Sequence, residues 1–314
     1  MRIGQNPAKQ IFEVAQPRPL SIAVVNFIPV LSGFHARSLE VLEACLDSLR
    51  ATTPEPFDLM VFDNHSCPEV RTALNGMLQR EEIQYLVLSD TNIGKIGAWN
   101  FLFGAARGEY VVYADGDMLF RPGWLEDARA LFAAYPQAGM VTACPVRNPA
   151  EVLAGTLAWG QAQGSLQTGT FVDWEAYLEL ALSIGWDEAK ARQRYTLDPD
   201  YRLEAGGKPA LAGAGHFQFM APRRVLQETL PLPSQAPMRG ERILDQKVND
   251  LGYLRLCSLK PYVYHMGNQP VGVPVAAPRP RARLLQRLVW LPGLRHVLLW
   301  IYNQLFRLFF DNVP

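Results

Sequence analysis

The sequence has little cysteine, no excess charge of either sign and no apolar run long enough to span a bilayer. Its four cysteines, Cys45, Cys67, Cys144 and Cys257, lack the CxxC or Cys/His spacing of a zinc site and are too few for a dense disulfide framework. Because 30 basic side chains balance 30 acidic ones, no overall field draws the chain to nucleic acid, and we expect no nucleic-acid partner. The first residues lack the apolar core of a secretion signal, so we expect a cytoplasmic protein.

The most informative segment is residues 110–120, an apolar run that ends in Asp115-Gly116-Asp117. Such a run predicts a buried parallel strand, and ligands of open α/β sheets lie beyond the carboxyl ends of the strands. Two carboxylates at that place favour Mg2+ or Mn2+ bridging to the phosphates of a nucleotide. The alternative is a solvated turn, since Asp and Gly are common turn residues.

Strand-like and helix-like segments alternate through the first part of the chain. This alternation predicts a parallel sheet with helices on both faces, and 314 residues are enough to bury a sizeable core. The serine at position 38 is expected to cap the first long helix. Expected strands cover 21–28, 57–64, 84–88 and 110–115, and expected helices cover 38–50, 69–80 and 94–107.

Several segments in this order resemble family 2 glycosyltransferases of the GT-A fold. They are the strand end and loop at 61–66, the segments 92–95, 98–100 and 105–110, the Asp-Gly-Asp, and the continuation at 121–125. The resemblance covers residues 20–125. It implies a GT-A type, Rossmann-like mixed sheet, mainly parallel and flanked by helices. The composition after residue 269 predicts in addition a C-terminal amphipathic helical tail.

The resemblance places a nucleoside-binding loop at the end of the second strand. Asp63 is a charged acceptor for a base imide or a ribose hydroxyl, although it could instead cap the turn at Ser66. Gly94 would allow close backbone approach, and Lys95 would offset diphosphate charge or lie in a solvated loop. The predicted nucleotide-binding residues are Asp63, Asn64, Gly94, Lys95 and Asp115.

The same resemblance predicts a metal site with Mn2+ or Mg2+ as the cofactor. Asp117 would be the direct ligand, and Asp115 would face the metal or the ribose. His265 follows the strand-like segment 259–264, where many family members carry a ligating histidine, and two carboxylates with one imidazole suit Mn2+. The alternative for His265 is a hydrogen-bonded cap of the strand end.

Residues 239–253 occupy the place of the acidic motif of the family, which supplies the catalytic base. Here Arg242 stands where the second acid is usual, so Glu241 or Asp245 must remove the proton of the acceptor hydroxyl. Gly252 resembles the end of the helix of this motif, and counting back from it along the sequence places Glu241 at the position of the base. Asp245 lies one helical turn further on, on the same face. The alternative is an exposed helix with surface ion pairs. His216, in the family-like segment 213–224, could contact diphosphate or acceptor, or could be a core residue.

Four parts of the chain are expected: an N-terminal extension at 1–19, a nucleotide-sugar-binding half at 20–145, an acceptor-binding half at 146–268 and a tail at 269–314. The acceptor half carries an insertion with a capped amphipathic helix at 173–182. The tail begins with a proline-rich linker, and its apolar, arginine-containing segment 294–310 suits the bilayer interface. We expect peripheral attachment to the inner face of the cell membrane, with packing on the protein itself as the alternative.

These features predict a metal-dependent, inverting glycosyltransferase of hexosyltransferase type. Its donor would be a nucleotide-diphosphate sugar, for which the resemblance implies UDP, and its acceptor a glycan or lipid-linked glycan of envelope polysaccharide synthesis. A catalytically silent sugar-nucleotide-binding protein is the alternative that Arg242 favours. A haloacid-dehalogenase-type phosphatase, with Asp115 as nucleophile, fits less well because Met118 stands where that motif has a small hydroxyl residue.

Overall fold

The computed structural model describes residues 4, 6–10, 13–234 and 240–271, and single positions at 297, 300, 301 and 304. The chain divides into two compact units, Met1–Val271 and Gly272–Pro314. The helices and strands given bounds within the described residues all lie in the first unit.

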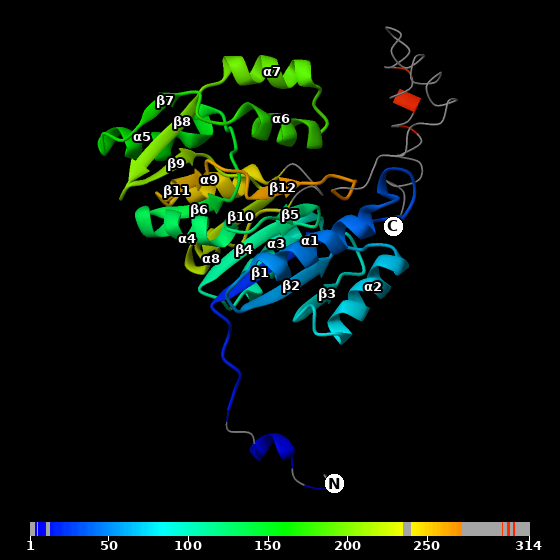
Figure 1. The fold of residues 1–314 in the computed structure, drawn as a ribbon. Helices are drawn as coiled ribbons and strands as arrows, with labels where there is room; N and C mark the ends of the chain where they lie inside the picture. The colour runs from blue at the N-terminus through cyan, green and yellow to red at the C-terminus, as the bar shows by residue number, and fades with distance from the viewer. Residues whose placement is uncertain are drawn as a thin grey trace. The chain divides into compact units, whose positions relative to one another are not determined.

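The first unit is built on a large mixed sheet (Figure 1). The order of its ten strands in the described residues is β3-β2-β1-β4-β10-β6-β11-β9-β8-β7, and β12 pairs with β5 in a separate ribbon. The strands are β1 Leu20–Asn26, β2 Phe57–Asp63, β3 Tyr85–Leu88, β4 Tyr110–Asp115, β5 Met118–Phe120, β6 Ala138–Thr142, β7 Gln167–Gly169, β8 Asp200–Ala205, β9 Lys208–Ala212, β10 Gln218–Pro222, β11 Leu254–Cys257 and β12 Val263–His265.

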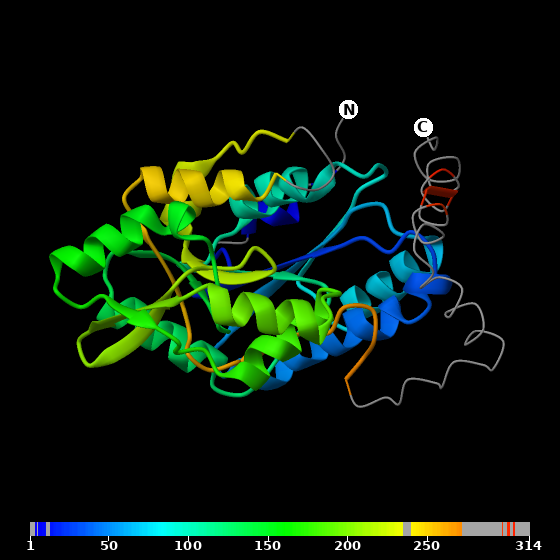
Figure 2. The same ribbon diagram turned by 90° about the horizontal axis from the view of Figure 1, so that it is seen from above.

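Helices connect these strands and cover both faces of the sheet. Figures 1 and 2 show α2 beside β3 at one end of the sheet and α5 to α7 around β7 and β8 at the other. The α-helices are α1 Ser38–Thr52, α2 Pro68–Gln79, α3 Gly94–Ala105, α4 Trp124–Ala134, α5 Ala154–Ala162, α6 Trp174–Ser183, α7 Glu188–Leu197, α8 Arg223–Thr229 and α9 Arg242–Asp250. Short 3-10 turns are η1 Pro7–Gln10, η2 Gly33–His35 and η3 Ala150–Leu153.

Strand direction changes along the sheet. Strands β3, β2, β1 and β4 run parallel to one another, as the alternation of strands and helices predicts. Strand β10 is antiparallel to β4 and to β6, and β6 and β11 form a further parallel pair. Antiparallel β9, β8 and β7 complete the sheet. The predicted fold class, a mixed sheet of GT-A type flanked by helices, is confirmed.

The two helical layers follow from the two-residue period of the strands. In β1, Leu20, Ile22 and Val24 pack with α1, α2 and α4 in one buried cluster. Ala23, between them, points to the other face and joins the cluster formed by α3, α8 and α9. Both faces of β1 are therefore buried, which explains why its sequence is almost continuously apolar.

The structure corrects several expected elements. Ser38 is the first residue of α1 and not its cap; its hydroxyl lies 3.2 Å from Nδ1 of His35. The strand expected near 213–222 begins only at Gln218, because residues 213–217 form a loop bonded to other parts of the chain. Strands β8, β9 and β11 were not expected, since charged side chains interrupt their apolar pattern. The cap of α6 is confirmed: Asp173 accepts bonds from Glu175 and Ala176.

The C-terminal segment 269–314 that the sequence assigns to a membrane-attached tail lies mostly outside the described residues. Of the apolar segment 294–310, four positions are described, among them Trp300 and Ile301, which are exposed. Within the part of the chain that the structure describes, no helix is both long and apolar enough to cross a membrane.

Candidate functional site

The strand register brings the predicted site residues to one edge of the sheet. Asn26 at the end of β1 pairs with Asp63 at the end of β2, and Val25 pairs with Asp115 at the end of β4. Strand β10 runs in the opposite sense, so its beginning lies at the same edge, where Asp115 N donates to Phe217 O at 2.8 Å. This edge is the usual ligand position in open α/β sheets.

Asp63 is fully buried and already has protein partners for both carboxylate oxygens. Oδ1 accepts from Asn26 Nδ2 at 3.1 Å, and Oδ2 accepts from the backbone N–H of Ser66 at 3.1 Å. Asn26 also donates to Ser66 Oγ at 3.0 Å. The cap to Ser66, which was the alternative for Asp63, is therefore present in the structure.

Asn64 holds the turn that leads into α3. Its Oδ1 accepts from the N–H of Ile93 at 2.9 Å, and its Nδ2 donates to Asn92 Oδ1 at 2.8 Å. Asn92 Oδ1 also accepts from the N–H of Gly94 at 2.9 Å. Gly94 has φ 75°, a left-handed conformation that favours glycine. The predicted nucleotide residues Asn64 and Gly94 thus act together in shaping the loop that precedes Lys95.

Lys95 reaches from the first turn of α3 to the carboxylate of Asp115. The ammonium lies 2.8 Å from that carboxylate and 5.4 Å from the ring centres of Trp99 and Tyr113. The hydroxyl of Tyr113 donates to Asp115 as well. Burial raises the pKa of Asp115 above its ordinary value, although the charge of Lys95 opposes this shift. Asp115 is therefore held by a cation and a hydroxyl of its own chain.

Asp117 and His265 form the second pair at this edge. Antiparallel pairing of β5 with β12 sets His265 opposite Met118, and His265 Nε2 lies 3.3 Å from Asp117 Oδ2. The other ring nitrogen lies 3.1 Å from Ser183 Oγ. Asp117 Oδ1 is buried with no hydrogen-bond partner in the described residues. This orphaned oxygen next to an imidazole fits a divalent cation, whose ligands are carboxylate and imidazole atoms.

Asp115 is the third metal ligand that the sequence predicts, but its side chain does not lie with those of Asp117 and His265. Among the described residues, no three His, Cys, Asp or Glu side chains gather closely enough to hold a metal ion. Asp117 and His265 lie together, whereas the carboxylate of Asp115 is directed to Lys95. Of the three predicted ligands, the structure brings two into contact.

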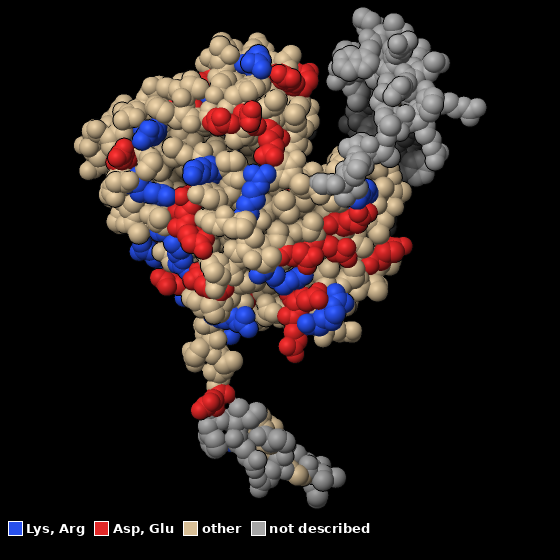
Figure 3. All heavy atoms as spheres, in the orientation of Figure 1, with Lys and Arg blue, Asp and Glu red and all other residues tan. Residues whose placement is uncertain are grey.

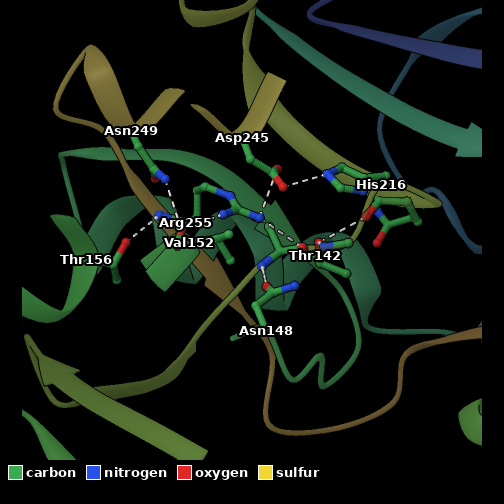
Figure 4. A network of polar contacts seen from close by, with 11 residues as sticks. Thr142, Asn148, Val152, Thr156, His216, Asp245, Asn249 and Arg255 are labelled. Carbon is green, nitrogen blue, oxygen red and sulfur yellow. Dashed lines mark hydrogen bonds and ion pairs between the residues drawn. The ribbon is translucent and has the colours of Figure 1, made fainter. Parts of the chain in front are cut away.

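The two predicted bases lie at or on α9, in different surroundings. Figure 4 shows those of Asp245. Asp245 is 4% exposed; its Oδ2 lies 2.7 Å from His216 Nε2 and its Oδ1 lies 2.8 Å from Arg255 Nη2. Arg255 is fully buried and also donates to the carbonyls of Val152 and Ala214. Glu241 is half-buried at the beginning of α9. The expected exposed helix with surface pairs is therefore not what surrounds Asp245.

Sequence reasoning missed two residues of this site. Asn26 ends an apolar strand in the same way as Asp63, and that shared position was a usable signal. Arg255 is a single charge inside the apolar run of β11, and a lone charge in a buried strand indicates a buried partner. Its partner, Asp245, is supplied by another element and cannot be read from spacing.

Charge is mixed on the face shown in Figure 3, where lysine and arginine side chains lie among aspartate and glutamate side chains. At the site, the pair of Lys95 with Asp115 brings opposite charges together.

Comparison with known proteins confirms the family resemblance over part of the chain. Residues 33–167 match the family model described as Glycosyl transferase family 2. This stretch runs from η2 to the beginning of β7 and includes Asp63, Lys95, Asp115 and Asp117. This part of the chain is similar to glycosyltransferase family 2 domains. No curated protein was found to match the chain.

Solved structures that are similar to this chain include the following three. TarS 1-349 of S. aureus is 14% identical, covering 79% of this chain and 60% of that chain, with a TM-score of 0.47. The mannosyltransferase PcManGT from Pyrobaculum calidifontis, in complex with GDP-Man and Mn2+, is 16% identical, covering 80% and 61%, with a TM-score of 0.45. GalNAc-T7 with UDP, GalNAc and Mn2+ is 15% identical, covering 87% and 48%, with a TM-score of 0.49. This chain spans less than two thirds of each of them.

Proposed function

We propose that this protein is a metal-dependent, inverting glycosyltransferase that uses a nucleotide-diphosphate sugar. The observation that carries the proposal is the meeting of Asp63, Asp115, Asp117 and His265 at one edge of the sheet. The three aspartates lie inside the segment that matches the family model. The proposed donor is a UDP-sugar, and the proposed acceptor is a glycan or a lipid-linked glycan.

The donor would lie across the strand ends. The loop braced by Asp63 and Asn64 would face the nucleoside, and the turn at Gly94 would bring backbone N–H groups close to it. Lys95 would share its charge between Asp115 and the diphosphate, since ammonium groups pair with phosphate. These roles place the nucleotide between α3 and the end of β4.

Asp117 and His265 would hold the divalent cation, Mn2+ or Mg2+. When bound, the cation would offset the charge that develops on the departing diphosphate. The acceptor hydroxyl would lose its proton to a base at the beginning of α9 or beside it, where Glu241 and Asp245 are the predicted candidates. Direct attack of that oxygen on the anomeric carbon inverts its configuration.

Thermal unfolding with a panel of sugar nucleotides tests the proposal. A ligand bound only by the folded state raises the melting temperature by mass action, so UDP-glucose, UDP-GlcNAc and GDP-mannose should be compared with and without Mn2+. We expect one donor to raise the melting temperature only with Mn2+, and Asp117→Asn to remove that rise. A matched control is Asp47→Asn, which removes an exposed carboxylate of α1. No rise with any donor would refute the proposal.

Turnover separates an enzyme from a silent sugar-nucleotide-binding protein. An enzyme releases nucleoside diphosphate from the donor, whereas a binding protein gives the Mn2+-dependent rise in melting temperature without release.

Peripheral membrane attachment through 294–310 stays a separate prediction. Co-sedimentation with anionic vesicles checks it, with the chain truncated after residue 271 as the control.

A further inference from the structure

The histidine in the loop before β10 lies where it could take the proton that the proposed transfer releases. His216 Nε2 lies 2.7 Å from Asp245 Oδ2, and the imidazole side chain is 25% exposed (Figure 4). Asp245 behind it is 4% exposed. The exposed member of this pair is therefore the histidine and not the carboxylate that the sequence suggests as a base.

Burial keeps the carboxylate of Asp245 from an acceptor hydroxyl. One oxygen faces His216, and the other lies 2.8 Å from the fully buried guanidinium of Arg255. A carboxylate paired with a guanidinium only accepts hydrogen bonds, so the imidazole must donate from Nε2. The lone pair of His216 then lies on Nδ1, which has no hydrogen bond to any described residue.

The loop before β10 brings His216 near the edge of the sheet where the predicted site residues lie. Gln218 pairs with Ala114, and Phe217, the residue after His216, accepts from Asp115 N at 2.8 Å. Its ring lies 6.5 Å from the ring of Trp99, which in turn lies under the ammonium of Lys95.

The loop that carries His216 is fixed by several backbone bonds. Gly213 N donates to Arg255 O at 2.9 Å, Ala214 N to Asn148 Oδ1 at 2.9 Å and Gly215 N to Thr142 Oγ1 at 2.8 Å. A Cβ on Gly213 would lie 2.9 Å from Val146 O, so only glycine fits this approach. A loop held in this way presents the imidazole in one orientation, which general-base catalysis requires.

We propose that His216 is the general base of the transfer, with Asp245 and Arg255 as positioning residues. This inference rests on the proposed function. The acceptor proton moves to Nδ1 of His216 while the acceptor oxygen forms its bond with the anomeric carbon. The bond from that carbon to the diphosphate oxygen breaks, and its electron pair leaves on the nucleoside diphosphate. Asp245 accepts the hydrogen bond from Nε2 of His216 throughout the step and stabilises the imidazolium that forms.

The test measures release of nucleoside diphosphate with water as acceptor, using the sugar nucleotide that gives the largest Mn2+-dependent rise in melting temperature. We expect His216→Gln to lower the rate by about 100-fold or more, the scale of general-base catalysis. The donor-induced rise in melting temperature should stay at the wild-type value, because His216 does not hold the donor. The glutamine amide can still donate to Asp245, which keeps the loop folded.

Chemical rescue separates catalysis from folding. We expect added imidazole to raise the rate of His216→Ala by about tenfold, and not to raise that of His216→Gln, whose side chain fills the space. Asp245→Asn should lower kcat by at least about tenfold with little change in KM, since it acts through the orientation of the ring. A structural role alone would give no rescue.

Glu241 provides the competing outcome. If Glu241→Gln loses the activity and His216→Gln stays within about threefold of wild type, Glu241 is the base and the assignment of His216 is overturned. If wild type neither binds nor hydrolyses any sugar nucleotide in the panel, the proposed function itself fails and takes this assignment with it. Loss of rate in His216→Gln with unchanged donor binding supports both.

Discussion

The ammonium of Lys95 lies 2.8 Å from the carboxylate of Asp115, and it bridges the first turn of α3 to the end of β4. The two side chains are 16% and 28% exposed, so water screens this pair only in part. A carboxylate predicted as a metal or ribose contact is thus also half of an ion pair. Its partner was predicted as a phosphate contact, and both groups would meet the donor together.

Replacement of Lys95 by methionine is expected to destabilise the fold by about 1 to 2 kcal/mol, because it leaves Asp115 without its cation in a largely desolvated place. The pKa of Asp115, already raised by burial, should rise further. Urea unfolding at neutral pH measures the stability. Lys260→Met, at an exposed position, is the control and should change little. Equal effects of the two substitutions would contradict the role given to Lys95.

Replacement of Asn26 by alanine is expected to cost about 1 to 3 kcal/mol, since it leaves buried Asp63 Oδ1 without its donor and removes one of the two donors to Ser66 Oγ, the other being the N–H of Ile28. Asn75→Ala removes an exposed amide bonded to a helix carbonyl and should cost less than about 0.5 kcal/mol. Chemical denaturation of both variants gives the comparison. A stable Asn26→Ala protein would mean that water replaces the amide.

Replacement of Arg255 by methionine is expected to cost about 3 to 5 kcal/mol, because Asp245 keeps its charge in a buried place without the guanidinium. The control is Arg192→Met, which breaks an ion pair with Glu188 whose side chains are both about 60% exposed. Such a surface pair contributes about 0 to 1 kcal/mol. Thermal unfolding monitored by circular dichroism should therefore separate the two variants clearly, and similar melting temperatures would argue against a buried ion pair.

The stability of the metal-free protein should fall as pH rises past neutrality. Burial alone lowers the pKa of His265, but the hydrogen bond and charge of Asp117 raise it overall above the ordinary value of 6.5. The folded state then binds this proton more tightly than the unfolded state. The resulting stabilisation is fully present below pH 6.5 and is lost as pH rises through the folded-state pKa.

Urea unfolding in EDTA from about pH 6 to about pH 8.5 checks this dependence, which His265→Gln should flatten. His65→Asn is the matched control, because His65 is exposed and its φ of 75° suits asparagine. Mn2+ competes with the proton for the imidazole, so Mn2+ affinity should rise over the same pH range. An affinity that does not depend on pH would place the cation elsewhere.

A methyl group on Gly108 is expected to destabilise the fold by about 1 to 3 kcal/mol or more. Its Cβ would lie 2.6 Å from Ser21 N and 2.8 Å from Leu20 C, backbone atoms of β1 that cannot move aside. Gly104→Ala, within α3, is the control: its Cβ meets only a Leu230 methyl at 3.9 Å, and helix propensity favours alanine by up to about 1 kcal/mol. Melting temperatures should shift in opposite directions, and a Gly108→Ala protein as stable as wild type would disprove the close approach.

The sequence by itself determined the parallel half of the sheet and the edge at which the site lies. Apolar runs at 21–28, 57–64 and 110–115 predict buried parallel strands, and parallel strands place their carboxyl ends together. The short strands β8, β9 and β11 were not predicted, because charged side chains interrupt their apolar patterns.

Only the tertiary structure decided which side chains pair at that edge. Asp245 pairs with Arg255 and accepts a hydrogen bond from His216. These three residues come from α9, from β11 and from the loop before β10. Local sequence patterns report which face of an element is buried, but not which buried charge finds which partner. That choice follows from the three-dimensional packing, because an unpaired charge in the interior costs more free energy than any local preference supplies.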